Sequence, residues 1–196
     1  MKTFRSLLTG VAAFALVTGT ASANLLADPS IEDAVTFIDD GNSVGQWNPF
    51  ASGDAASVHS TADPRTLLGH ADFSTASDNQ FAGMFQDVLT PAGSEVDWTV
   101  WAKDLLGTNG AGIEMRIEFR DSVNNVEISR TSNYTPASLG SAYELVAHPT
   151  TTVPAGADTS RVVFAIQSFG GVTQSQLFVD DASVTIVPEP ATAALL

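Results

Sequence analysis

Strict alternation of apolar and charged residues marks the segment from Ile113 to Arg120. Ile, Met, Ile and Phe occupy its odd positions, and charged residues occupy all of its even positions. A period of two places successive side chains on opposite faces of a strand, so that one face is buried and the other meets solvent. The segment is therefore expected to be a half-buried β-strand.

Five further segments have the composition of strands, and no long segment between residues 24 and 187 has a helical period. Glycine, proline and asparagine occur between these segments, as in residues 91–94 and 107–110. Residues 50–80 are rich in Ala, Ser and Asp and are expected to form loops with one or two weak strands. Many short strands with intervening turns predict an antiparallel sandwich or barrel. The five expected strands are Phe81–Val88, Val96–Lys103, Tyr143–Ala147, Arg161–Gln167 and Leu177–Ile186.

The N-terminus has a different pattern, in which a basic start precedes an apolar run and a small-residue site. Lys2 and Arg5 come before an apolar run from Leu7 to Val17, which is shorter than the roughly 20 residues of a membrane span. Ala21 and Ala23 form the small-x-small site. These features predict a cleavable secretory signal with cleavage after Ala23, and they fit the alternative of a buried N-terminal helix less well.

Composition narrows the class of protein. Residues 1–23 are expected to be removed as the signal, and residues 24–187 are long enough for one domain with its own core. The chain has 22 acidic and 8 basic residues, a net charge of −14, and two of the basic residues lie in the signal. Such a surface repels nucleic acid and anionic membranes, and it is compatible with divalent cations and neutral polymers.

The sequence contains no recognisable catalytic motif. It has no Gly-x-Ser-x-Gly elbow, phosphate loop or His-Glu-x-x-His motif, and it has no cysteine. His59, His70 and His148 lack the spacing of a zinc site. A glycoside hydrolase needs two carboxylates at a defined separation, which a sequence with 22 acidic residues does not identify. We therefore expect a protein that is not an enzyme.

Both ends of the 24–187 region resemble carbohydrate-binding modules of the family 4, 9 and 22 type. Residues 24–32 read Asn-Leu-Leu-Ala-Asp-Pro-Ser-Ile-Glu, and residues 178–184 read Phe-Val-Asp-Asp-Ala-Ser-Val. Those modules begin with Asn-Leu-Leu-x-Asn-Pro-Gly-Phe-Glu and end with Val-Asp-Asp-Val-Ser. Residues 98–103 and 153–164 are similar to their inner strands. The resemblance implies an all-β, antiparallel jelly-roll β-sandwich of the galactose-binding-like kind, and it specifies the fold better than the ligand.

The same resemblance implies a calcium ion between the first and last strands, held by Glu32 and Asp180. Alternation would place Asp180 beside Phe178 and Ala182 on a largely apolar face, where a carboxylate needs a partner or a metal. Calcium takes six to eight oxygen ligands, and the sequence does not identify the others. In the alternative, Asp180 caps a turn or accepts hydrogen bonds from backbone amides.

Pro188, Glu189 and Pro190 resemble the start of a PEP-CTERM sorting tail. In that family the tripeptide precedes a transmembrane helix and a basic cluster, and an exosortase recognises the tail in Gram-negative bacteria that make exopolysaccharide. Two prolines would end the last strand and keep the peptide extended. The sequence stops at Leu196 without such a helix, so residues 188–196 are expected to be the start of a truncated tail. Contact with the membrane is expected only through the helix that this tail lacks, and the alternative is a chance Pro-Glu-Pro linker.

Aromatic residues on a polar strand face are candidates for stacking on sugar rings. Trp101 shares a strand face with polar residues, whereas Trp98 falls on the apolar face and is expected in the core. Arg116 and Glu118 are expected beside Trp101 as hydrogen-bond partners for sugar hydroxyls, and Trp47 is a second aromatic candidate. In the alternative, alternating Glu and Arg form cross-strand ion pairs on a solvated face, and both tryptophans pack beneath loops.

Together these features predict an exported, non-catalytic protein of the envelope or extracellular matrix of a Gram-negative bacterium. It is expected to bind or associate with polysaccharide and to meet an exosortase-type sorting enzyme. One alternative is a structural surface or biofilm matrix protein with no specific sugar site, and another is a secreted glycan-active enzyme. An exposed aromatic platform beside polar residues would favour the first function, and two carboxylates facing each other in a cleft would favour the enzyme.

Overall fold

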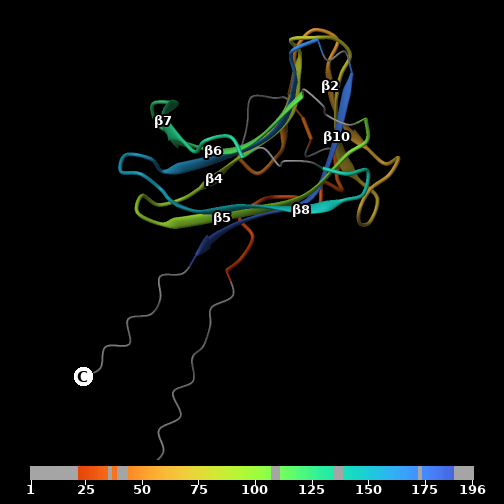
Figure 1. Cartoon of the computed structure of the whole chain (residues 1–196). Helices are drawn as coiled ribbons and strands as arrows, with labels where there is room; N and C mark the ends of the chain where they lie inside the picture. Colours follow the sequence, from red (N-terminus) through yellow and green to blue (C-terminus); the bar gives the residue numbers. More distant parts are fainter. Residues whose placement is uncertain are drawn as a thin grey trace, which may run out of the picture.

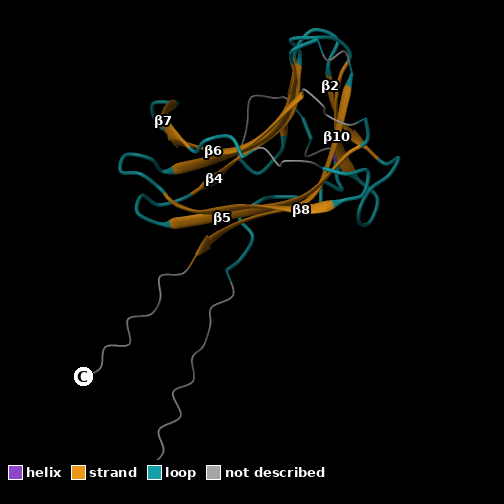
Figure 2. Ribbon diagram, in the orientation of Figure 1, coloured by secondary structure: helices purple, strands orange, loops and turns teal. Residues whose placement is uncertain are grey.

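Two β-sheets packed face to face form the molecule, as the computed structural model shows (Figure 1). The structure describes residues 22–34, 37–38, 44–106, 111–134, 139–171 and 174–187. Figure 2 shows strands joined by loops, with no α-helix in these ranges. Among the same residues, no helix has the length and apolar character needed to cross a bilayer. Most of the expected signal, including Ala21, and the expected sorting motif at Pro188, Glu189 and Pro190 lie outside the described residues.

Sheet I has the strand order β1-β4-β9-β6-β7, and all of its neighbouring strands are antiparallel. The expected alternation of β6 is confirmed, because its apolar side chains point into the core while its charged ones point outward. The strands are β1 (Asn48–Ala51), β4 (Phe81–Leu89), β9 (Thr159–Ser168), β6 (Ala111–Asp121) and β7 (Val126–Arg130).

Sheet II has the order β2-β3-β10-β5-β8 and is also antiparallel throughout. All six strands expected from the sequence are present. The region expected to hold weak strands supplies β2 and β3, while β7 was not expected because most of its side chains are exposed and carry no burial signal. The strands are β2 (Ala56–Ser60), β3 (His70–Thr75), β10 (Ser175–Val187), β5 (Glu95–Asp104) and β8 (Glu144–Thr152).

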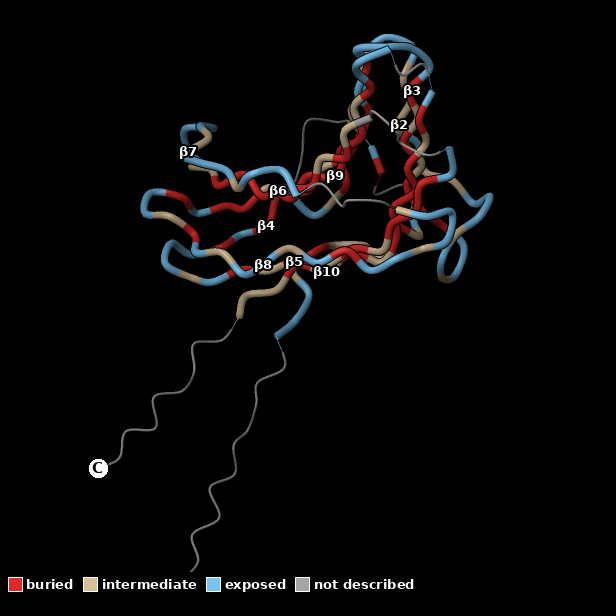
Figure 3. Tube along the Cα trace, viewed as in Figure 1, coloured by how far each residue is buried: buried red, intermediate tan, exposed pale blue. Residues whose placement is uncertain are grey.

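Inward-facing side chains of both sheets form a single hydrophobic core. Figure 3 shows buried residues along the strands of both layers. Trp98 from sheet II and Phe164 from sheet I are fully buried, and their rings meet edge-on at 5.3 Å. Burial of such a side chain contributes about 1.5–3 kcal/mol. The expectation that Trp98 belongs to the core is confirmed.

The segment 24–32 runs beside β10 without forming a regular strand. The Leu25 amide donates to the Val184 carbonyl at 2.8 Å. The Asn24 side chain bridges the same strand, donating to the Ala182 carbonyl at 3.0 Å and accepting from the Val184 amide at 3.0 Å. The expected proximity of the two ends of the domain is confirmed.

A β-bulge in β10 places Asp180 on the opposite face of the strand from the one expected. The register against β5 shifts between Asp180 and Ser183, and Asp181 has a φ of 45°. An extra residue reverses the faces on either side of it, which simple alternation does not reveal. Asp180 and Phe178 therefore lie on the outer face of sheet II rather than on its apolar inner face. The core-facing residues of this strand include Leu177, Val179, Ala182 and Val184.

Candidate functional site

The outer face of sheet I carries two hollows. The larger, of about 420 Å³, has Phe85, Arg120 and Arg161 in its walls. The smaller, of about 220 Å³, lies between the aromatic side chain of Phe81 and the charged side chain of Arg116. The candidate site consists of these two hollows and the side chains around them.

Strand register explains which side chains meet on this face, because directly opposite residues share a face. We call a set of directly opposite residues on neighbouring strands a row. Successive rows on this face are two residues apart along each strand. The three central rows are Phe50–Gly83–Ala165–Glu114, then Asn48–Phe85–Val163–Arg116, then Asp87–Arg161–Glu118–Arg130. The face thus changes from aromatic and small residues at one end to charged residues at the other.

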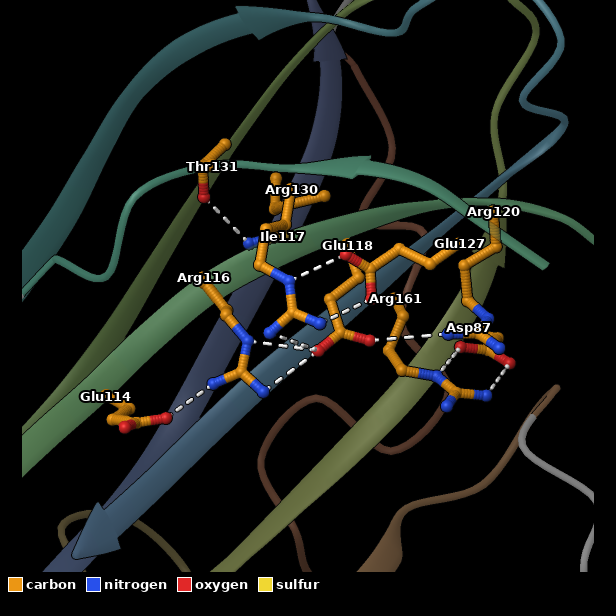
Figure 4. A network of polar contacts seen from close by, with 10 residues as sticks. All are labelled: Asp87, Glu114, Arg116, Ile117, Glu118, Arg120, Glu127, Arg130, Thr131 and Arg161. Carbon is orange, nitrogen blue, oxygen red and sulfur yellow. Dashed lines mark hydrogen bonds and ion pairs between the residues drawn. The ribbon is translucent and has the colours of Figure 1, made fainter.

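A network of ion pairs covers the charged part of this face (Figure 4). Arg116 lies between two carboxylates, with Nη1 2.6 Å from Glu114 Oε2 and Nη2 2.9 Å from Glu118 Oε1. Glu118 is only 6% exposed, and it also pairs with Arg120 at 3.5 Å and Arg130 at 3.8 Å. Three guanidinium groups therefore compensate the charge of one buried carboxylate, which is the condition for burying an ion without a large penalty.

Arg161 and Asp87 form a second, two-pronged ion pair beside this network. Nε and Nη2 of Arg161 donate to the two carboxylate oxygens of Asp87 at 2.7 and 2.8 Å. The guanidinium carbon lies 4.0 Å from the centroid of the Phe85 ring. A planar fork held at two points and stacked on a ring keeps a fixed orientation. Arg161 therefore presents a rigid polar edge next to an aromatic surface.

An aromatic cluster of Phe50, Phe81 and Phe85 completes the face. The Phe50 ring centroid lies 6.0 Å from that of Phe81 and 6.2 Å from that of Phe85, and Phe81 is 43% exposed. Aromatic surface next to hydrogen-bonding groups matches molecules that have both apolar faces and polar edges. The sequence contains a signal for this cluster, since Phe81 and Phe85 lie on one face of an expected strand, although the expected aromatic candidates were both tryptophans.

The expected site residues separate onto two faces of the molecule. Arg116 and Glu118 lie together in the network of sheet I, whereas Trp101 lies on the outer face of sheet II. The expectation that Trp101 sits beside the 113–120 strand is wrong, because β5 and β6 belong to different sheets. Trp101 is half-buried, with the Arg65 guanidinium carbon 3.7 Å from its ring centroid.

Trp47 does not fit its expected ligand role. Its side chain is 0% exposed, and its ring lies 6.0 Å from that of Phe164 in the core. Its Nε1 donates to the Asp28 carbonyl at 3.0 Å, so that its polar atom is also satisfied within the fold. The alternative, in which this loop residue packs onto the core, is the correct one.

Residues 61–69, which we call the covering loop, lie over the outer face of sheet II. Oδ2 of Asp180 accepts hydrogen bonds from two amides of this loop, at 2.8 and 3.3 Å. Oε2 of Glu32 accepts from two more, at 2.7 and 3.1 Å. The interpretation that Asp180 bonds backbone amides is confirmed. The four donors are the amides of Arg65, Thr66, Leu68 and Gly69.

These bonds bear on the expected calcium ion at Glu32 and Asp180. Oδ1 of Asp180 accepts from the Asp181 amide at 2.7 Å, so only Oε1 of Glu32, which is buried, has no hydrogen-bond partner. Calcium takes six to eight oxygen ligands, and within the described ranges no three His, Cys, Asp or Glu side chains are grouped for a metal. The residues do not fit a calcium ion in this arrangement. The calcium site stays a prediction, which removal of metal tests.

Beneath the covering loop lie polar groups that are sealed from water. The Lys103 ammonium is paired with Asp63 and lies 4.3 Å from the Tyr143 ring centroid. His70 is 0% exposed, its ring centroid lies 4.3 Å from that of Phe178, and neither ring nitrogen has a hydrogen-bond partner. Burial lowers the pKa of His70 to about 4. It also raises the pKa of Asp180, to about 6.

No known protein-family profile matches this chain, and no curated protein matches its sequence. Solved structures do match its fold. The CBM22-1 xylan-binding domain from Paenibacillus barcinonensis Xyn10C is similar over 88% of this chain and 100% of its own, with a TM-score of 0.58 and 12% identity. TmCBM61, solved in complex with β-1,4-galactotriose, is similar over 85% of this chain and 100% of its own, with a TM-score of 0.53 and 15% identity.

A third similar structure is the enzymatically active domain of tailspike protein 4 from bacteriophage CBA120. It matches 84% of this chain with a TM-score of 0.62 and 16% identity, and this chain spans only 21% of its length. Identities this low show a shared fold and no more. The expected fold is confirmed: the chain is an all-β, antiparallel jelly-roll sandwich like that of carbohydrate-binding modules.

Proposed function

We propose that the outer face of sheet I binds polysaccharide without catalysing its cleavage. The observation that carries this proposal is the presence of two hollows between an aromatic cluster and a network of paired charges on one face. A sugar ring has an apolar C–H face and an edge of hydroxyl groups. Phe50, Phe81 and Phe85 offer surface to the first, and the network offers donors and acceptors to the second.

The charge balance of this face supports an uncharged ligand. Each arginine of the network is paired with a carboxylate, as in Arg116 with Glu114 and Arg161 with Asp87. A hydrogen bond from Arg130 lowers the pKa of Glu127, as expected for a carboxylate that pairs with a cation. Paired groups still hydrogen-bond to hydroxyls, whereas a negatively charged polymer would meet a chain whose net charge is −14.

Two of the similar structures support this class of ligand. One is described as a xylan-binding domain, and the other was solved with β-1,4-galactotriose. At 12% and 15% identity they support the general class and do not identify the sugar.

Export and sorting belong to the same proposal and rest on sequence features alone. The signal pattern in residues 1–23 favours secretion, and Pro188–Glu189–Pro190 favours recognition by an exosortase-type enzyme. The protein would then act in the cell envelope or extracellular matrix of a Gram-negative bacterium. Expression with the signal intact, followed by N-terminal sequencing of the exported protein, is expected to give Asn24 as the first residue, and a retained Met1 would contradict it.

Affinity electrophoresis tests the binding function. The purified chain is run through native gels containing xylan, galactan or the exopolysaccharide of the source bacterium, beside Phe85→Ala and the control Leu145→Ala. Leu145 is exposed on the outer face of sheet II, away from the proposed site. Retardation of the wild type and Leu145→Ala, with free migration of Phe85→Ala, supports the proposal. Free migration of folded protein in every gel would instead favour a structural matrix protein without a sugar site.

A further inference from the structure

We propose that the smaller hollow of sheet I is a slot for one uncharged pyranose ring, in which Ala165 forms the floor and Gly83 positions the aromatic wall. This inference rests on the proposed function, because it assumes that the outer face of sheet I binds a glycan. The inference identifies the part of this face that would discriminate among glycans, and it names the residues that would determine this specificity.

Gly83 allows Phe50 to lie across the sheet. A Cβ atom at Gly83 would come 2.5 Å from the Phe164 carbonyl oxygen, 2.6 Å from the Ala165 Cβ and 2.7 Å from the Phe50 ring. Real Cβ atoms do not make such contacts, so the Phe50 ring occupies space that any other residue at position 83 would fill. Phe50 thereby reaches from the edge strand β1 over β4 and becomes a wall of the slot.

Ala165 sets the depth of the slot. It lies opposite Gly83 on one side and Glu114 on the other, and it lines the hollow of about 220 Å³. Of its two neighbours, Gly83 has no side chain, and the side chain of Glu114 pairs with Arg116. The single methyl group of Ala165 therefore leaves an opening where a larger apolar side chain would close it.

The walls of the slot differ in polarity. Phe50 and Phe81 line one side, and the ion pair of Glu114 with Arg116, at 2.6 Å, lines the other together with Gln167. A pyranose ring placed between them would turn its C–H face to the rings and its hydroxyl edge to the polar groups. Since Glu114 and Arg116 neutralise each other, the slot favours a ring without charge.

Size indicates that the slot takes one ring. Pockets for drug-sized ligands measure about 300–1,000 Å³, and this hollow is smaller, at about 220 Å³. The larger hollow, of about 420 Å³, lies further along the same strands, beyond Phe85. In this proposal, the sugar rings next to the one in the slot lie in the larger hollow. A bulky substituent on the ring in the slot would meet the floor.

Isothermal titration calorimetry with xylohexaose and β-1,4-galactotriose tests the slot. Ala165→Leu fills it and is expected to weaken binding of the preferred oligosaccharide about tenfold or more, since a misplaced methylene group alone changes recognition about 10–200-fold. Phe81→Ala removes an exposed wall and is expected to weaken binding without changing the melting temperature. Ala147→Leu, on the exposed face of β8, is the matched control and is expected to bind like the wild type.

A third variant tests specificity rather than affinity. Ala165→Gly deepens the slot and is expected to improve binding of an arabinose-substituted xylan relative to unsubstituted xylan. Should Ala165→Leu fail to fold, Phe81→Ala and Ala165→Gly still decide the question.

The outcomes separate the slot from the proposed function. Wild-type affinity in Phe81→Ala and in folded Ala165→Leu, with binding abolished by Phe85→Ala, would overturn the slot and leave polysaccharide binding intact. Absence of binding by the folded wild type to any glycan would remove the proposed function itself, and the slot with it.

Discussion

The two outer faces of this sandwich use polar side chains in opposite ways. On sheet I, carboxylates and guanidinium groups pair with one another beside open hollows. On sheet II, Lys103, His70 and Asp180 lie beneath the covering loop and are at most 3% exposed. The first arrangement leaves hydrogen-bonding groups within reach of a ligand, whereas the second uses such groups to fasten a loop. The comparison supports the proposal that a ligand binds on sheet I, and it gives the polar groups of sheet II a structural role.

The same comparison shows how pKa shifts can mislead a search for function. Strongly shifted pKa values often mark catalytic sites, and here His70 and Asp180 have large shifts. Their first cause is desolvation under the covering loop, which accompanies any polar group sealed into a fold. On sheet I, the compensated ion pair of Arg161 with Asp87 belongs to the open face. The shifted pKa values of His70 and Asp180 therefore reflect their packing beneath the covering loop and are not evidence of a catalytic site.

Removing the carboxylate that fastens the covering loop should have the largest effect. Asp180→Ala leaves the amides of Arg65 and Thr66 without acceptors, and it is expected to lower the free energy of unfolding by about 3 kcal/mol, because each unsatisfied buried group costs about 1–3 kcal/mol. Differential scanning calorimetry should show a melting temperature lower by about 6–12 °C. Asp54→Ala, at an exposed position, is the control. A melt of Asp180→Ala that matches the control would contradict the structural role of this face.

Acidification should expose the cost of burying His70. Its pKa in the folded protein is about 4, below the usual 6.5, so the unfolded chain binds the proton first and stability is lost as the pH falls from about 6.5 to about 4. The pKa of Asp180 is raised to about 6 from 3.8, so its contribution has the opposite sign and grows as the pH falls through that range. The wild type alone therefore shows a partly cancelled effect.

His70→Phe isolates the histidine contribution. The variant keeps a ring against Phe178 and removes two nitrogens that have no partner. It is expected to be more stable than the wild type at pH 7, by about 1 kcal/mol. This advantage should grow by about 3 kcal/mol between pH 7 and pH 4. Urea titrations of both proteins across this range measure the difference, and an advantage independent of pH would show that His70 is not held neutral by burial.

On sheet I the expected effect falls on binding rather than on stability. Arg161→Lys keeps the charge but loses the two-pronged contact with Asp87 and the planar stack on Phe85. Affinity for the glycan is expected to fall about tenfold, which is about 1.4 kcal/mol, while the free energy of unfolding is expected to change less than in Asp180→Ala, because the lysine keeps a positive charge beside Asp87. Calorimetric titration and thermal melting provide the two values. A large loss of stability with unchanged affinity would reverse the roles assigned to the two faces.

Removal of metal should have the smallest effect. The oxygens of Asp180 and Oε2 of Glu32 already accept hydrogen bonds from amides, so the melting temperature is expected to stay the same in EDTA and in added calcium. Elemental analysis confirms that metal has been removed. A melting temperature that rises with calcium would support the calcium site expected from the sequence, by the linkage between binding and stability.

Local patterns in the sequence predicted the strands well and the site only in part. The alternation in β6 identified both its core face and the charged face that carries Arg116 and Glu118. The facing of Asp180 was wrong because one extra residue in the bulge reverses the alternation. Trp47 was misassigned because a loop residue has no periodicity from which its burial can be inferred.

By itself the sequence determined that the chain is all-β and which side chains share a strand face, because a period of two is a property of each strand alone. Only the tertiary structure decided which strands share a sheet. β5 and β6 follow one another along the chain, yet they pair with different partners in different sheets. Trp101 and Arg116, which local patterns placed side by side, therefore lie on opposite outer faces of the sandwich. Strand partners are chosen by packing across the whole core, which no local pattern records.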